Sequence, residues 1–290
     1  MVTKAGWKAT FAAALVLGLM IGAALSYVID AMREPAQDST GGRGETAPRE
    51  REKGSSPPRE REKGSSPPPR GLNVDFTGDF ETGDYRQWSS VQEDEDDRIQ
   101  IVQDPVREGR FASRHEVRAG DEVADGSRAE LLWGSSGEPT LREGSEHYFG
   151  WSTYFGMNFP SPGPDDGHSL FLQWKDEGDG SPPMEMSARE ERIALRIDNV
   201  DRWAIPLTRG VWHDFVARVR FSSDDDEGLI EIWHDGVKVA EGLRTSTLKP
   251  DQSSYLKLGY YRSEEFEEPG VIYHDGMRVG SSYEAVAPRD

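Results

Sequence analysis

The chain has 290 residues, which is enough for one large β domain and additional segments. It contains no cysteine, and this excludes a disulfide framework and thiol chemistry. The formal net charge is −19, and no stripe of lysine and arginine is visible, so the composition argues against nucleic-acid binding.

The N-terminal segment combines two basic residues with an apolar run. Lys4 and Lys8 precede the uncharged residues 9–29. This run is long enough for a helix that spans a bilayer, and it is long for a cleaved signal peptide. The lysines indicate a cytoplasmic N-terminus. We expect residues 1–30 to be a signal anchor and the protein to be a single-pass cell-membrane protein with its C-terminal domain outside. A cleaved signal peptide and a secreted protein are the alternative.

The next segment, residues 31–72, is rich in proline, glycine, serine and charged residues. A ten-residue sequence that begins at Pro48 is repeated from Pro58. With almost no apolar side chains, such a segment has too little surface to bury for a stable fold. It is therefore expected to be a disordered linker between the membrane and the domain.

Residues 73–290 show short alternating segments separated by frequent turns. Apolar residues alternate along 215–221, and residues 229–233 are followed by an Asp235-Gly236 turn that predicts a hairpin. No window of twelve or more residues has a convincing helical period. This pattern predicts an all-β domain, a concanavalin-like β-jelly roll of two curved antiparallel sheets.

Three predicted strands of this domain carry a polar face. They are Arg128-Ala129-Glu130, Gln173-Trp174-Lys175 and residues 255–261. Because alternate residues of a strand share a face, each strand has one apolar side for the core and one polar side. Side by side, the three strands form a polar floor on which a long polar polymer can lie.

The polar residues suit β-elimination of a uronic-acid polymer. This reaction needs donors that neutralise the carboxylate, a base for the C5 proton and an acid for the leaving oxygen. Arg128 and Gln173 are suitable donors, and Tyr261 is able to serve as base, acid or both. Lys175 is a base if its pKa is lowered, or else a partner that makes Tyr261 more acidic. Lys257 adds positive charge on the same face.

The order and spacing of these strands resemble the jelly-roll polysaccharide lyases, the group of alginate, glucuronan and heparin lyases. Their Arg-x-Glu-Leu, Gln-x-His and Tyr-x-Lys-x-Gly-x-Tyr motifs are matched at residues 128–131, 173–175 and 255–261. The resemblance implies a lyase that moves protons with a histidine and a tyrosine. The family's histidine falls at Lys175 in this sequence.

From these arguments we predict two sets of site residues. The catalytic candidates are Tyr261, Lys175, Gln173 and Arg128. Further substrate contacts are expected from Glu130, Lys257, Tyr255 and Arg262. His168, five residues before Gln173, is a further residue that is able to enter the groove from a loop.

The chemistry itself requires no cofactor, but the resemblance implies a structural Ca²⁺. In jelly-roll carbohydrate proteins such an ion links the first and last strands. The analogous positions are Glu81 and Asp275, whose carboxylates are ligands that calcium favours.

The predicted function is eliminative cleavage of a uronate-containing polysaccharide. The expected partners are an anionic polysaccharide and the membrane, and the chain itself is expected to be a monomer. The alternative is a non-catalytic carbohydrate-binding or surface-interaction module on the same fold. The replacement at Lys175 and the acidic charge favour this alternative, whereas Arg128, Gln173, Lys257 and Tyr261 together favour the enzyme. The hypothesis of a glucanase-type hydrolase is weaker, because the sequence lacks the spacing of carboxylates that such enzymes use.

Overall fold

The structure is a computed structural model and describes residues 73–136, 141–163 and 167–289. In these ranges the chain forms strands and one short helix. They are β1 (Val74–Gly78), β2 (Ser90–Gln92), β3 (Ile99–Val102), β4 (Ala112–Val117), β5 (Ser127–Trp133), β6 (Glu146–Phe155), β7 (Ser169–Asp176), β8 (Met184–Arg189), β9 (Arg192–Ile197), β10 (Val200–Pro206), β11 (Trp212–Arg220), β12 (Leu229–His234), β13 (Val237–Arg244), β14 (Ser254–Arg262), β15 (Gly270–Gly280) and α1 (Tyr283–Val286).

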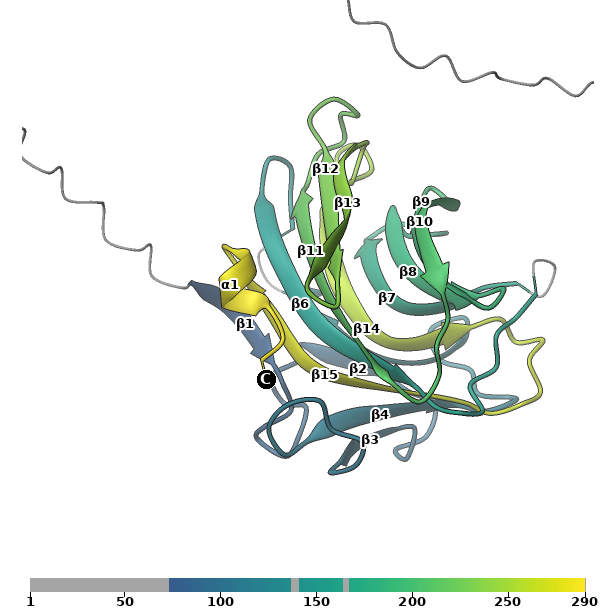
Figure 1. The fold of residues 1–290 in the computed structure, drawn as a ribbon. Coiled ribbons are helices and arrows are strands. Elements are labelled where there is room, and N and C mark those ends of the chain that lie inside the picture. Colours follow the sequence, from purple (N-terminus) through teal and green to yellow (C-terminus); the bar gives the residue numbers. More distant parts are fainter. Residues whose placement is uncertain (1–72, 137–140, 164–166, 290) are drawn as a thin grey trace, which may run out of the picture. The chain divides into compact units, whose positions relative to one another are not determined.

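The strands form two antiparallel sheets. Sheet A has eight strands in the order β13-β12-β11-β6-β15-β4-β3, with β1 paired to β15. Sheet B has seven strands in the order β10-β9-β8-β7-β14-β5-β2. The longer strands of both sheets are strongly curved (Figure 1). The prediction of an all-β domain with two antiparallel sheets is confirmed, and the arrangement is consistent with a jelly roll.

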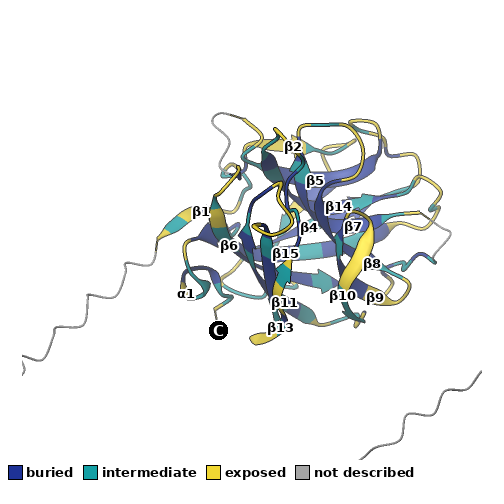
Figure 2. Ribbon diagram, turned by 90° about the horizontal axis from the view of Figure 1, so that it is seen from above, coloured by how far each residue is buried: buried dark blue, intermediate teal, exposed yellow. Residues whose placement is uncertain are grey.

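The core lies between the two sheets and is rich in aromatic side chains. Trp151 of sheet A meets Trp174 of sheet B with ring centroids 6.3 Å apart, and Phe215 meets Phe171 at 6.0 Å. These rings are almost fully buried, and each contributes roughly 2 kcal/mol of burial free energy. Figure 2 shows β5 and β14 as largely buried, whereas the edge strand β10 is mostly exposed over its first half.

The three polar strands predicted from the sequence lie side by side as β5, β14 and β7. Tyr261 pairs with Arg128 across β14 and β5, and Lys257 pairs with Gln173 across β14 and β7. Since the alternate residues on each strand enter the core, the polar residues are held on the opposite face of sheet B.

Two buried histidines of sheet A support these strands from the core side. His115 on β4 contacts the carbonyl oxygen of Ala129 through Nδ1 at 3.0 Å, and His274 on β15 contacts that of Gly259 through Nε2 at 3.1 Å. A carbonyl only accepts, so both ring nitrogens donate. The two bonds connect sheet A directly to the strands that carry Arg128 and Tyr261.

Gly259 allows the close approach of β14 to β5. Its φ is +156°, and a Cβ at this position would lie 2.2 Å from the carbonyl oxygen of Ala129. Only glycine fits there without a backbone shift.

The structure tests the predicted hairpin but not the predictions for the N-terminal segments. The Asp235-Gly236 hairpin is confirmed, with φ values of 49° and 76° that are typical of a type I′ turn. The predicted anchor or signal peptide at 1–30 and the linker at 31–72 lie outside the described residues. Among the residues that are described, no helix has the length and apolar character needed to cross a membrane.

Candidate active site

A cleft of about 520 Å³ lies on the face of sheet B that points away from the core. Most of the side chains predicted from the polar strands line it: Arg128, Gln173, Lys175, Tyr255, Lys257 and Tyr261. The cleft also contains His168, Glu185 and Arg196. The alternation of polar and apolar residues on adjacent strands thus brings acids, bases, an amide and phenols together in one cleft.

Glu130 does not line the cleft itself: it is only 2% exposed and is bonded to three residues that do. Its carboxylate accepts a hydrogen bond from the Gln173 amide and one from Lys257 Nζ at 3.3 Å, and it lies 3.5 Å from Arg128. Burial lowers the pKa of Lys257, while the Glu130 charge acts in the opposite direction. Glu130 therefore holds the three donors in place and partly balances their charge.

Tyr261 lies against two nitrogen-containing side chains. The Arg128 guanidinium carbon is 3.9 Å from the centroid of the Tyr261 ring, and the His168 ring centroid is 4.2 Å from it. Burial raises the pKa of the Tyr261 phenol, although the Arg128 charge works against this. The phenol therefore remains protonated at neutral pH.

His168 is neutral at the same pH. Burial, with a contribution from the Arg128 charge, lowers the pKa of its imidazole to about 4. Its Nε2 is buried and has no hydrogen-bond partner within the described part of the chain. An unprotonated imidazole therefore lies beside a protonated phenol. His168 precedes β7 and is outside the Gln-x-His motif position, so the motif alone did not identify it.

Lys175, at the position of the family's histidine, is fully engaged in local bonds. Its ammonium donates to the carbonyl and carboxylate oxygens of Asp176 and to the carbonyl oxygen of Gly178. An ammonium has three protons, so these bonds use all of them. Lys249 also pairs with the Asp176 carboxylate, at 2.7 Å. In this arrangement Lys175 stabilises the segment after β7 and is not a free base.

The two remaining residues that were predicted to contact the substrate, Tyr255 and Arg262, lie in different environments. The Tyr255 phenol lines the cleft, and burial raises its pKa. Arg262 is 1% exposed, and its guanidinium donates to the carbonyl oxygens of Phe266 and Glu268. Arg262 therefore anchors the loop between β14 and β15. It also lines a smaller pocket together with His168 and Tyr261, and its role in substrate binding stays a prediction.

Glu185 and Arg196 extend the polar floor beyond the predicted residues. They pair with each other on β8 and β9, at 2.8 Å between Oε1 and the guanidinium, and Glu185 is directly opposite Gln173. Burial raises the pKa of Glu185, and Arg196 opposes this shift. Apolar core residues alternate along 184–187 and 192–197, and this alternation is a sequence signal that places Glu185 and Arg196 on the polar face.

The predicted calcium ligands lie beside one loop. The Glu81 carboxylate accepts from the backbone N–H groups of Arg110 and Phe111, and that of Asp275 accepts from those of Arg107 and Glu108. Burial raises the pKa of Asp275 to about 7. These bonds show how both carboxylates hold the loop before β4, and the calcium site stays a prediction.

The fold and the cleft together are those of a jelly-roll protein with a polar binding face, a class that includes lectin domains. The chain matches the model of a family described as polysaccharide lyase over residues 80–278. It therefore belongs to this polysaccharide lyase family, and the resemblance predicted from the three motifs is confirmed.

Solved structures share the fold at low sequence identity. The endo-β-1,4-glucuronan lyase from the fungus Trichoderma reesei has a TM-score of 0.60 at 18% identity, over 75% of this chain and 99% of that chain. The catalytic domain of a glycoside hydrolase family 131 protein from Coprinopsis cinerea has a TM-score of 0.54 at 13% identity, over 75% of this chain and 98% of that chain. No curated protein sequence matches the chain.

Proposed function

We propose that the cleft on sheet B cleaves a uronate-containing polysaccharide by β-elimination. The observation that carries the proposal is the meeting of Arg128, Gln173, His168 and Tyr261 in one cleft. Membership of the polysaccharide lyase family supports it. A uronate carboxylate fits the guanidinium and amide donors, because charge-assisted hydrogen bonds to a carboxylate are the stronger ones.

The proposed chemistry uses two groups in complementary protonation states. The base takes the proton from C5, the C4–O4 bond breaks, and a C4=C5 double bond forms. The leaving O4 receives a proton from the Tyr261 phenol. Arg128 and Gln173 stabilise the charge that develops on the carboxylate during this step.

His168 is the proposed base for the C5 proton. Its environment keeps the imidazole unprotonated at neutral pH, and that of Tyr261 keeps the phenol protonated. Groups whose pKa values are shifted in opposite directions are suited to separate roles as base and acid. A bound uronate adds a negative charge near His168, and this charge raises the pKa of the imidazole and makes it a better base. Tyr261 acting alone as base and acid is the other arrangement.

The non-catalytic binding module remains the second candidate function. It is favoured by one observation, the engagement of Lys175 with Asp176 and Gly178 at the position of the family's histidine. On either account the domain acts outside the cell, held at the membrane by residues 1–30 or released after their cleavage. The apolar run at 9–29 supports this part of the proposal.

The test is a panel of uronate polymers, among them polyglucuronate, alginate and heparin. Elimination produces a C4=C5 double bond conjugated with the carboxylate, and its ultraviolet absorbance reports each cleavage. The proposal predicts that absorbance with at least one polymer. Saturable binding of a polymer without any unsaturated product, at every pH tried, would favour the binding module.

A further inference from the structure

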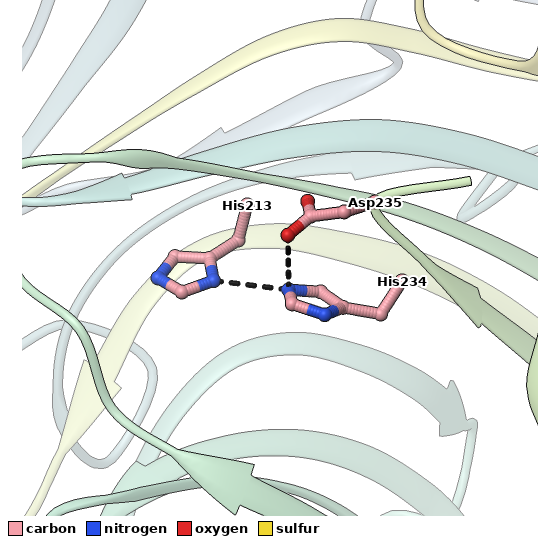
Figure 3. Close-up of side chains that lie close together, drawn as sticks. All are labelled: His213, His234 and Asp235. Atoms are coloured by element: carbon pink, nitrogen blue, oxygen red, sulfur yellow. Dashed lines mark hydrogen bonds and ion pairs between the residues drawn. The ribbon is translucent and has the colours of Figure 1, made fainter. Parts of the chain in front are cut away.

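A second cluster of polar side chains lies outside the cleft, where β11 begins and β12 ends. It consists of His213, His234 and Asp235, and their potential ligand atoms all lie within 4.8 Å of one another. Figure 3 shows His213 and Asp235 directed at the same ring nitrogen of His234. None of the three lines the cleft on sheet B.

The spacing of the ligand atoms fits one small cation. His213 Nδ1 is 3.0 Å from His234 Nε2, which is 3.4 Å from Asp235 Oδ2. Ligands at 2.0–2.2 Å in a tetrahedron around Zn²⁺ are separated by about 3.4 Å. Two imidazoles and a carboxylate form a donor set that Zn²⁺ and similar transition metal ions favour.

A second layer of hydrogen bonds orients two of the three ligands. His213 Nε2 is 2.8 Å from the carbonyl oxygen of Thr208, and because this oxygen only accepts, Nε2 carries the proton. The lone pair of His213 Nδ1 is therefore directed at the centre of the cluster. The backbone N–H of Asp214 donates to Asp235 Oδ1 at 3.0 Å, which leaves Oδ2 for the cluster. Such outer bonds are typical of metal-binding histidines and carboxylates.

The cluster lies on paired strands and a tight turn, while one side of it is open to solvent. His234 is opposite Phe215 in the β11–β12 pairing, and Asp235 is the first residue of the two-residue turn to β13. His213 is 4% exposed, whereas the Asp235 side chain is 56% exposed. Three protein ligands with a solvent-facing side leave a fourth position for water.

We propose that His213 Nδ1, His234 Nε2 and Asp235 Oδ2 bind a divalent transition metal ion such as Zn²⁺. The ion joins the start of β11 to the β12–β13 turn and stabilises this end of sheet A. The alternative is a metal-free chain of hydrogen bonds from His234 to His213. The inference does not depend on the proposed elimination, since the site lies outside the cleft.

The experiment is a titration of the full chain, first stripped of metal by a chelator, with Zn²⁺ and with Co²⁺. We expect one saturable site by calorimetry, a Co²⁺ absorption band of a four-coordinate ion, and a rise of the unfolding temperature with Zn²⁺. His234→Gln is expected to weaken Zn²⁺ binding at least about 100-fold, and Asp235→Asn about tenfold, because an asparagine retains the turn but removes the charge.

The matched control is His147→Gln on the neighbouring strand β6, where the histidine is also mostly buried and pairs with Asp75 at 3.5 Å. It is expected to leave the affinity for Zn²⁺ unchanged. No saturable binding by the parent chain, or equal affinity in the parent and His234→Gln, overturns the proposal in favour of the hydrogen-bond chain. His213 is 4% exposed, so its replacement endangers the fold, and the outcome is decided by His234→Gln and Asp235→Asn.

Discussion

His168 and Tyr261 lie in ring contact at 4.2 Å between centroids, although 93 positions in sequence separate them. The contact arises because β7 and β14 are neighbours in sheet B, with Leu170 opposite Tyr261. It places a neutral imidazole beside a protonated phenol in a cleft that also contains Arg128 and Gln173. The account of catalysis depends on this pair.

Tyr261→Phe removes only the phenolic hydroxyl, which donates no hydrogen bond to any described residue. If this hydroxyl protonates the leaving oxygen, kcat should fall by about 100-fold or more, with little change in the unfolding temperature. Steady-state kinetics on the cleaved polymer and a melting curve provide the check. An unchanged kcat would remove Tyr261 from the proton transfer.

His168→Gln tests the proposed base. It retains a polar side chain but loses the titrating imidazole, so kcat should fall by about 100-fold or more. If His168 acts only by packing against Tyr261, the loss of kcat should instead follow a loss of stability.

Lys175→Met is the companion variant at the family's histidine position. It removes one ionic partner of the buried Asp176 carboxylate, but Lys249 remains paired with it. The free energy of unfolding should therefore fall by about 2 kcal/mol, the worth of one hydrogen bond to a charged group, and by less than the cost of an unpaired buried charge. Denaturant unfolding measures this change. Lys175→His separates two possibilities for activity: a gain in kcat would make the lysine a substitute for a lost base, and a decrease would give it a role of its own.

Gly126→Ala tests how tightly the cleft is packed around Tyr261. The added Cβ would lie 2.7 Å from Tyr261 Cε2 and 2.8 Å from an Arg128 guanidinium nitrogen. Both side chains must move, so kcat/KM should fall about tenfold or more. Gly156→Ala is the control, because its nearest contact is an ordinary 3.5 Å to the carbonyl oxygen of Val271. Equal activities of the two variants would show that the placement of Tyr261 is not critical.

The buried histidines predict loss of stability in mild acid. Burial lowers the pKa of His115 to about 4 and that of His274 well below its ordinary value. The unfolded chain binds protons on these rings near pH ~6.5, so between about pH 6.5 and 4 it holds more protons than the folded chain. The free energy of unfolding therefore falls as the pH falls through this window, by about 3 kcal/mol for His115 alone.

The raised pKa of Asp275 acts in the opposite direction, because the folded chain takes up that proton first. A comparison with His115→Gln isolates the histidine. The difference in unfolding free energy between the parent and this variant should shrink as the pH falls from about 6.5 to 4.5. A constant difference over this range contradicts the prediction.

The sequence was sufficient to predict the three polar strands and their shared face. Alternation determines which side of a strand enters the core, and the apolar residues of 128–131, 173–175 and 255–261 alternate regularly. The hairpin at Asp235-Gly236 was equally accessible, because a two-residue turn with positive φ has strong sequence preferences.

Alternation predicts the face on which a polar side chain lies, but it does not predict which groups that side chain contacts. Lys175 lies on the predicted face, but its ammonium turns to Asp176 and Gly178 within its own loop. Arg262 follows Tyr261 and lies on the other side of the strand, where it binds loop carbonyls. His168 contacts Tyr261 only because the two sheet strands meet in this register.

The most direct test of the central claim is the combined mass of the products. Elimination adds no water, so the account predicts that the two products together have the mass of the substrate. The new non-reducing end then bears the unsaturated uronate. Products that together gain one water and have a saturated non-reducing end would show hydrolysis, and they would contradict the assignment of His168 and Tyr261 to an eliminative reaction.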